Sequence, residues 1–224
     1  MNEKAAVGEK AAVDFVKDGM IVGLGTGSTV YYTILKIGEM VRQGMKIKGV
    51  ATSVQTEKLA AEQGIPLLSI DEAQTIDVAI DGADEIDHHF YAIKGGGGAL
   101  LREKIIAKAS KEFVVVADSK KVVQRLGNFP LPVEVVPFGA GKTEGYIQKF
   151  GCRTVLRMQG DSPYITDNGN YIIDCHFGEI DDPKQLEKEL NNITGVVENG
   201  LFVDIVKHVI TIDEDKHAIL LPRA

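Results

Sequence analysis

Cysteine is scarce in this sequence, and its scarcity argues against two classes of protein. The 224 residues contain two cysteines, Cys152 and Cys175, which form no C-x-x-C pair. A disulfide scaffold needs a denser framework of cysteines, and a zinc site needs ligands at regular spacing. The five histidines show no metal-ligand spacing on a helix either. We therefore expect two reduced, partly buried thiols and no metal site.

Basic charge and aromatic side chains are also in short supply. The net charge is -7, with 25 Lys and Arg residues against 32 Asp and Glu residues. Nucleic acids and anionic membranes are bound by basic patches, so neither is an expected partner. The aromatic residues make up 6% of the chain and are scattered, which argues against a surface for stacking bases. A small phosphate-bearing molecule is compatible with this charge, because a few lysines and helix ends suffice to bind it.

Long hydrophobic runs are absent as well. No apolar run approaches the length of a membrane span, and the first residues lack the apolar core of a signal peptide. We therefore expect a cytoplasmic protein. A chain of 224 residues suffices for one large domain or two modest ones and buries roughly 70% of its unfolded surface.

The first half of the chain alternates short apolar runs with helical patterns, which is typical of a doubly wound, mostly parallel α/β sheet. The expected strands are residues 20–24, 46–51, 65–70, 77–80 and 113–117, and the expected helices are residues 3–16, 30–41, 54–63 and 97–110. Polar loops at residues 25–29, 81–84 and 118–121 follow three of these strands. Parallel strands bind ligands at their carboxyl edge, so we expect the three loops to meet there.

The second half has a different order of elements. Two prolines within residues 128–132 interrupt the earlier pattern. Beyond them come strand, helix, strand, strand, helix and strand at residues 133–136, 140–150, 154–158, 171–175, 183–191 and 196–199. This β-α-β-β-α-β order is ferredoxin-like. We predict a Rossmann-like domain over residues 1–128, a smaller ferredoxin-like α+β domain over residues 129–205, and C-terminal strands within residues 206–224 that return to the first sheet.

Residues 81–104 combine the groups that proton transfer needs. Asp81 and Asp84 follow a buried strand, Lys94 precedes four glycines, and Glu103 lies in the first turns of the next helix. Glycines let backbone amides approach a ligand closely, and helix N-termini bind anions. Carboxylates can move protons while a lysine and fixed amides stabilise an oxyanion. This stretch therefore predicts an active site.

The loop Gly-Thr-Gly-Ser-Thr at residues 25–29 predicts a phosphate site. It joins a strand to a helix, and two hydroxyls beside two glycines at a helix start suit a monophosphate. A dinucleotide fingerprint, as in a nucleotide-dependent oxidoreductase, is the competing interpretation. It fails because Ser28 or Val30 stands where the third glycine is needed, and because the next strand ends in Thr52 and Ser53 instead of an acidic residue.

Several sequence blocks resemble the A-type ribose-5-phosphate isomerases. They are Gly-Thr-Gly-Ser-Thr at 25–29, Asp-Gly-Ala-Asp-Glu at 81–85, Lys-Gly-Gly-Gly at 94–97 with Arg-Glu-Lys at 102–104, and Phe-Pro-Leu-Pro-Val-Glu at 129–134. The resemblance implies interconversion of D-ribose 5-phosphate and D-ribulose 5-phosphate through an enediolate, in the non-oxidative branch of the pentose phosphate pathway. It implies a sugar phosphate as ligand, no metal or organic cofactor, and a homodimer or tetramer, whose interface we expect on the smaller domain.

The resemblance also implies residue roles. Glu103 corresponds to the general base that moves a proton between C1 and C2, and Lys94 suits the stabilisation of the oxyanion. Opening of the sugar ring needs an acid or base of its own, for which Asp81 and Asp84 are both candidates. The implied substrate-binding residues are Thr26, Gly27, Ser28, Thr29, Asp81, Gly82, Ala83, Asp84, Lys94, Gly95, Gly96, Gly97, Lys121 and Lys4. The neighbouring Lys120 leaves open which of the two lysines points inward.

A second function fits the same pattern. Similar α/β domains bind phosphosugars as regulatory modules, so a non-catalytic sugar-phosphate sensor is the alternative. The presence of both Glu103 and Lys94, and the lack of a preceding helix-turn-helix, favour the enzyme.

Overall fold

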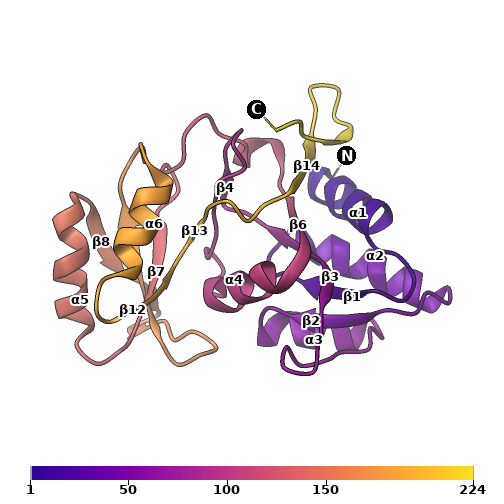
Figure 1. Cartoon of the computed structure of the whole chain (residues 1–224), viewed down its shortest axis with the longest axis horizontal. Helices are drawn as coiled ribbons and strands as arrows, with labels where there is room; N and C mark the ends of the chain where they lie inside the picture. The colour runs from indigo at the N-terminus through magenta and orange to yellow at the C-terminus, as the bar shows by residue number, and fades with distance from the viewer. Residues whose placement is uncertain (1, 224) are drawn as a thin grey trace.

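The computed structural model describes residues 2–223, in which a six-stranded sheet forms the larger part (Figure 1). Its strand order is β15-β14-β6-β3-β1-β2. The strands are β1 (Ile21–Leu24), β2 (Lys48–Ala51), β3 (Ile76–Gly82), β6 (Ser110–Val116), β14 (His208–Ile212) and β15 (Ala218–Leu220). All neighbours are parallel except β14 and β15, which pair antiparallel. The predicted α/β class with a mostly parallel sheet is confirmed.

Helices cover both faces of this sheet. They are α1 (Glu3–Phe15), α2 (Val30–Arg42), α3 (Val54–Glu62) and α4 (Leu100–Ala109). Helices α1, α2 and α3 pack on one face, and α4 packs on the other. Along β6, Val114 and Val116 face the first core, whereas Phe113 and Val115 face the second. This two-residue alternation is that of a strand buried on both sides, as in doubly wound folds.

A four-stranded antiparallel sheet with two helices forms the second part. Its elements are β7 (Leu131–Val135), α5 (Ala140–Ile147), β8 (Arg153–Leu156), β11 (Tyr171–His176), α6 (Pro183–Asn191) and β12 (Val196–Asn199). The strand order β12-β7-β11-β8 joins the first and fourth strands of the β-α-β-β-α-β unit, as in ferredoxin-like folds. A separate core includes Val133, Ile147, Ile173 and Leu190. The exact domain boundaries stay a prediction.

Several short elements were not predictable, because two- or three-residue segments carry no periodic pattern. They are β4 (Glu85–Ile86), β5 (Ala92–Ile93) and β13 (Leu201–Phe202), which form a small sheet, the hairpin of β9 (Met158–Gln159) and β10 (Ser162–Pro163), and the 3-10 helices η1 (Ser119–Lys121) and η2 (Gln148–Phe150). The small sheet fixes the entry to the glycine run. Its ladder is continued by the amide of Lys94, which donates to the carbonyl of Gly200 at 2.9 Å.

One predicted strand is wrong. Residues 65–70 form no strand, and only Leu67 bridges to the sheet, at Gly49 of β2. Pro66 has no N–H to donate, and the segment lies beyond the edge strand β2, so a longer ladder does not form. The predicted helix at residues 97–110 begins later, at Leu100, because residues 95–98 form a turn.

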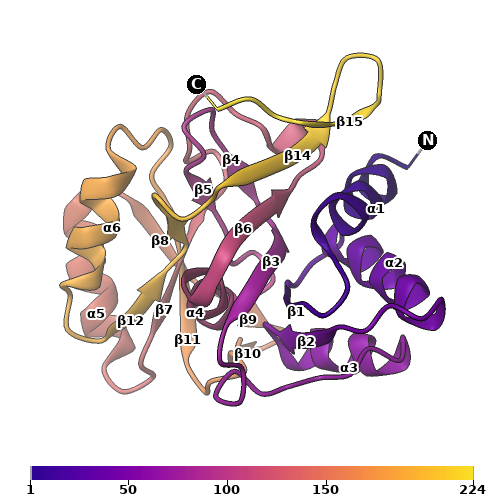
Figure 2. The same ribbon diagram turned by 45° about the vertical axis from the view of Figure 1, so that its right-hand side comes forward.

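Helix α4 lies between the two sheets in both views of the fold (Figures 1 and 2). Its buried Lys104 donates to Glu198 at 2.8 Å, to Glu187 at 3.3 Å and to the carbonyl of Asn199 at 2.7 Å. Glu198 lies on β12, Glu187 lies on α6, and Asn199 is the last residue of β12. The helix is therefore fixed to the second part at the residue next to Glu103.

Two further observations concern the remaining expectations. Cys152 and Cys175 are free thiols and both are buried, more completely than expected. Among residues 2–223, no helix combines the length and the apolar character needed to cross a lipid bilayer.

Candidate active site

The loops that follow β1, β3 and β6 meet at one edge of the central sheet. Together with the glycine run they line a cavity of about 250 Å³. The lining residues are Thr26, Gly27, Ser28, Thr29, Gly82, Ala83, Asp84, Lys94, Gly95, Gly96, Gly97, Glu103 and Lys121. Each of them is among the residues that the sequence singled out.

Two further predicted residues lie beside this cavity. Asp81 is buried next to it at the end of β3 and contacts Lys94. Lys4 reaches from α1 to the rim, where its Nζ donates to Ser28 Oγ at 2.8 Å. The structure therefore brings the whole predicted set together, from stretches of the chain between residues 4 and 121.

A buried ammonium group lies between two carboxylates. Lys94 Nζ is 3.0 Å from Asp81 Oδ2 and 3.2 Å from Glu103 Oε2, and all three side chains are at most 3% exposed. The same Nζ donates to the carbonyl of Gly82 at 2.5 Å and lies 5.3 Å from the centre of the Phe202 ring. A buried charge is costly unless it is paired, so these partners fix the position of the lysine.

The surroundings of Glu103 make it a weaker acid than an ordinary glutamate. Burial, and then the negative charge of Asp81, raise the pKa of Glu103 to about 8, although Lys94 lowers it. Burial raises the pKa of Asp81 as well, and Lys94 together with the amides of Thr26 at 3.0 Å and Gly82 at 2.7 Å, which donate to its Oδ1, opposes that rise. Burial opposes the charge of Lys94, but Asp81 and Glu103 outweigh it and raise the pKa of Lys94. Near neutral pH, the lysine therefore stays charged while Glu103 can exchange a proton.

Asp84 differs from Asp81 in where its carboxylate points. It lines the cavity, and its Oδ2 accepts from the amide of Gly96 at 2.7 Å. Asp81 instead contacts the lysine and two backbone amides outside the cavity wall. Of the two aspartates, Asp84 is thus the one whose carboxylate a ligand can reach. The sequence alone does not distinguish them.

Glu85, the last residue of the acidic block, has a structural role. Its two carboxylate oxygens accept from the amides of Gly127 and Phe129, both at 2.7 Å. It therefore joins β4 to the chain that enters the second part.

The two adjacent lysines after β6 lie differently. Lys121 lines the cavity, and its Nζ donates to the carbonyl of Ala83 at 2.6 Å. Lys120 is exposed and is not part of the cavity wall. The short helix η1 therefore turns Lys121, and not Lys120, toward the site.

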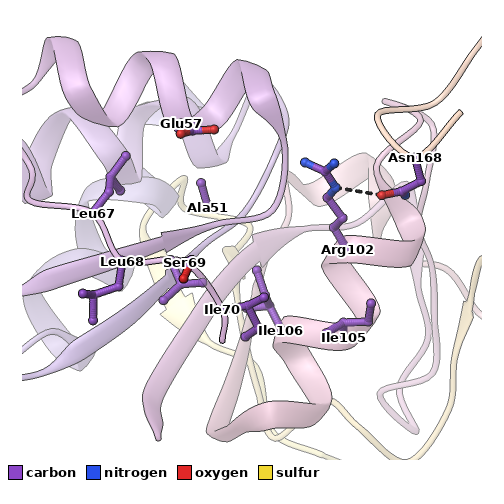
Figure 3. A pocket seen from close by; sticks show the side chains of 11 residues that line it. Ala51, Glu57, Leu67, Leu68, Ser69, Ile70, Arg102, Ile105, Ile106 and Asn168 are labelled. Atoms are coloured by element: carbon purple, nitrogen blue, oxygen red, sulfur yellow. Dashed lines mark hydrogen bonds between the residues drawn. The ribbon is translucent and has the colours of Figure 1, made fainter. Parts of the chain in front are cut away.

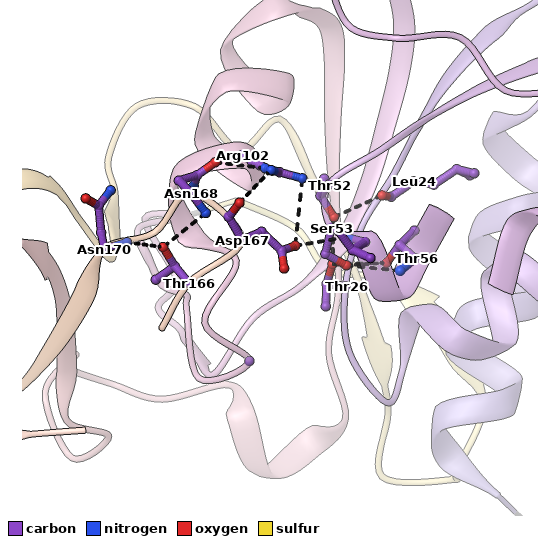
Figure 4. A network of polar contacts seen from close by, with 12 residues as sticks. Leu24, Thr26, Thr52, Ser53, Thr56, Arg102, Thr166, Asp167, Asn168 and Asn170 are labelled. Atoms are coloured by element: carbon purple, nitrogen blue, oxygen red, sulfur yellow. Dashed lines mark hydrogen bonds and ion pairs between the residues drawn. The ribbon is translucent and has the colours of Figure 1, made fainter. Parts of the chain in front are cut away.

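Hydroxyl groups surround the side-chain oxygen of Thr26 (Figure 4). Thr26 Oγ1 lies 2.7 Å from Thr52 Oγ1, 2.8 Å from Ser53 Oγ and 3.0 Å from Thr56 Oγ1. Ser53 also caps α3 by accepting from the amide of Thr56 at 3.0 Å. In dinucleotide-binding folds an acidic residue stands at the end of this strand. Here Thr52 and Ser53 stand there and bind Thr26 in the loop at residues 25–29.

A larger cavity of about 560 Å³ lies between β2, the segment at residues 67–70 and α4 (Figure 3). Apolar side chains such as Leu67 and Ile106 dominate its wall, and Glu57 and Arg102 are its charged residues. It lacks the convergent acids, lysines and amides of the smaller cavity, which is therefore the better candidate for catalysis. Within residues 2–223, one group of three potential metal ligands lies close together, namely Asp213, Asp215 and His217. This group lies in the turn between β14 and β15, outside both cavities.

The raised pKa of Glu103 makes the stability of the fold depend on pH. In the folded chain this carboxyl titrates at about 8, against an ordinary value of 4.5. Between these two values the folded state holds more protons than the unfolded state, so the free energy of unfolding falls as pH rises through this window. We expect Glu103→Gln to remove this loss, so that the variant gains stability relative to the natural chain between about pH 5 and pH 9. Urea unfolding at several pH values measures it, and parallel pH profiles would contradict it.

Comparison with known proteins identifies a family. The family model described as ribose 5-phosphate isomerase A (phosphoriboisomerase A) matches residues 48–216. The ribose-5-phosphate isomerase A of Bacillus mycoides is 54% identical over 206 residues, which cover 92% of this chain and 93% of that protein.

Solved structures agree with this match along the whole chain. A structure of D-ribose-5-phosphate isomerase in complex with phospho-erythronic acid superimposes with a TM-score of 0.95 at 43% identity and covers 100% of both chains. The ribose 5-phosphate isomerase A of Methanocaldococcus jannaschii gives a TM-score of 0.92 at 41% identity and covers 98% of this chain and 97% of that chain. On this evidence, the chain belongs to the ribose 5-phosphate isomerase A family.

Proposed function

We propose that this chain is an aldose-ketose isomerase that interconverts D-ribose 5-phosphate and D-ribulose 5-phosphate, in the non-oxidative branch of the pentose phosphate pathway. The observation that carries the proposal is the contact between Glu103, a carboxyl with a raised pKa, and the charged Lys94 at a cavity that also holds a candidate phosphate loop. Family membership supports the same reaction. The phospho-erythronic acid bound to a 43% identical relative supports a phosphorylated, sugar-like ligand.

Glu103 is the general base of this mechanism. It takes the proton from C2 of the open aldose and delivers it to C1, while a hydroxyl proton passes from O2 to O1. A base works best when its pKa lies near the operating pH, and the pKa of about 8 meets that condition.

The enediolate formed between the two proton transfers needs fixed donors. Lys94 supplies a positive charge that its buried partners hold in place. Gly97 lines the cavity, and its amide has no hydrogen-bond acceptor within residues 2–223, so we assign this amide to the oxyanion. Each such preorganised donor is worth about 3–4 kcal/mol of transition-state stabilisation.

The remaining residues bind and open the sugar. Asp84 is our candidate for ring opening, because it faces the cavity, whereas Asp81 acts through Lys94 and raises the pKa of Glu103. The loop at residues 26–29 precedes α2, whose N-terminus favours an anion, and we assign it the phosphate together with Lys4. Binding the phosphate far from C1 and C2 orients the reacting carbons.

The sensor alternative is not favoured. A sensor needs a phosphate site but no base of raised pKa, and this chain combines both at one cavity. The named relatives are isomerases across most of their length.

The first prediction concerns the base. In chelator-treated buffer, the natural chain should convert D-ribose 5-phosphate to the ketose, and Glu103→Gln should lower kcat by about 10²- to 10⁴-fold because it cannot accept the proton. Glu62→Gln, an exposed change on α3, is the matched control and should keep the full rate. A fully active Glu103→Gln would transfer the role of base to Asp84. An inactive natural chain that ribose 5-phosphate still stabilises against heat would support the sensor.

A second prediction separates the adjacent lysines. Lys121→Met should raise KM for ribose 5-phosphate by about tenfold or more, since a hydrogen bond to a charged group is worth about 1.5–3 kcal/mol. Lys120→Met should change KM less than about twofold, because this side chain is exposed outside the cavity. Steady-state kinetics of the two variants measure the difference. Equal effects of both would contradict the assignment.

The domain boundaries, the assembly and the location are also proposals. We assign residues 1–128 and 206–224 to a catalytic domain and residues 129–205 to a smaller domain that carries the interface of a cytoplasmic homodimer or tetramer. The support is an exposed apolar surface on the smaller domain, where Phe138 is 94% exposed beside a hollow of about 790 Å³. Light scattering tests the assembly, and a monomer at micromolar concentration would contradict it.

A further inference from the structure

The second part of the chain contacts the glycine run of the catalytic cavity through one arginine. Arg157 lies between β8 and β9, and its Nη1 donates to the carbonyls of Gly95 at 2.9 Å and Gly96 at 3.2 Å. From this contact we infer that Arg157 is a positioning residue, which turns the peptide groups of the glycine run so that the amide of Gly97 faces the enediolate and the amide of Gly96 holds Asp84. The inference rests on the proposed isomerase function.

The guanidinium group is itself held in a fixed orientation. Its Nε and Nη2 donate to the two carboxylate oxygens of Asp174 on β11, at 2.9 Å and 2.5 Å. The arginine side chain is 16% exposed and the aspartate side chain 20%. A two-pronged ion pair of this kind fixes both the position and the plane of the guanidinium. The remaining Nη1 is therefore presented to the glycine carbonyls as a rigid donor.

Peptide geometry carries the effect from these carbonyls to the cavity. Across a trans peptide, the carbonyl of one residue and the N–H of the next point in opposite directions, and residues 2–223 contain no cis peptide. Drawing the carbonyls of Gly95 and Gly96 toward Arg157 therefore directs the amides of Gly96 and Gly97 away from it. The amide of Gly96 reaches Asp84 at 2.7 Å, and Gly97 lines the cavity. The first of these amides holds the proposed ring-opening residue Asp84, and the second is the donor that the mechanism assigns to the oxyanion.

The glycine run needs such an external anchor. Gly95 and Gly98 have φ values of +100° and +80°, which side chains with a Cβ rarely adopt, so glycine is required there. The same freedom leaves the run with little restraint of its own beyond the turn in which the amide of Gly98 donates to the carbonyl of Gly95 at 2.9 Å. Tyr164 adds a weaker contact from the same part of the chain: its hydroxyl donates to the carbonyl of Gly97 at 3.4 Å.

The contact acts through geometry more than through charge. Asp174 neutralises the guanidinium, so the pair adds little net positive potential at the cavity. Lysine would keep the charge but cannot form the two-pronged pair and bond the carbonyls at the same time. Arg157→Lys should therefore fail to restore the natural rate, whereas a purely electrostatic role would let it do so.

The experiment compares Arg157→Lys and Arg157→Gln with the natural chain. Since the amide of Gly97 acts on the enediolate and less on the bound aldose, we expect kcat to fall by about 10- to 100-fold while KM for ribose 5-phosphate stays within about threefold. Phospho-erythronic acid, whose carboxylate resembles the enediolate, should bind more weakly by a factor similar to the loss in kcat. Arg153→Lys, at an exposed position of β8, is the matched control and should change none of these values.

The outcomes separate this inference from the proposed function. Unchanged kcat and unchanged phospho-erythronic acid affinity in a folded Arg157→Lys would overturn the positioning role. A rise in KM that accounts for the whole loss of kcat/KM would overturn it as well. If Arg157→Gln does not fold, Arg157→Lys supplies the test. If the natural chain has no isomerase activity, the proposed function fails. Weaker binding of phospho-erythronic acid to Arg157→Lys would then still support the orientation of the amides, and unchanged binding would contradict it.

Discussion

The rest of the site depends on one buried interaction, the placement of Lys94 between Asp81 and Glu103. These three residues come from a strand end, the start of a glycine run and a helix, so their contact fixes all three elements at one edge of the sheet. When both carboxylates are ionised, they share a single ammonium and the cluster carries one excess negative charge. Burial, and then the charge of Asp81, therefore raise the pKa of Glu103 and turn an ordinary carboxylate into a base suited to neutral pH.

The second part of the chain supports this edge of the sheet at several points. Lys104 fixes α4 to β12 and α6 at the position next to Glu103. Arg157 contacts the glycine run, and Asp167 accepts from the amide of Val54 at the start of α3, beside the hydroxyl cluster around Thr26 (Figure 4). Residues remote in sequence from the cavity thus hold its wall. Their contacts orient the glycine run, which has no side chains of its own to fix it.

Much of this arrangement could be predicted from the sequence. The alternation of strands and helices predicted the parallel sheet. The polar loops after β1, β3 and β6 predicted where the cavity lies, because parallel strands share a carboxyl edge. Residues 65–70 misled the prediction, since an apolar run with β-branched residues does not reveal that it lies beyond an edge strand. The roles of Arg157 and of Thr52 could not be predicted at all. Both depend on long-range contacts that leave no local pattern.

The most direct test of this account is the titration of Glu103 itself. Carbon-13 NMR of glutamate-labelled protein, with the signal assigned by its loss in Glu103→Gln, measures the midpoint of this one carboxyl. We predict a midpoint of about 8 in the natural chain and a lower one in Asp81→Asn, because the neighbouring charge that raises the pKa is removed. A midpoint near the ordinary 4.5 that Asp81→Asn leaves unchanged would contradict the central claim.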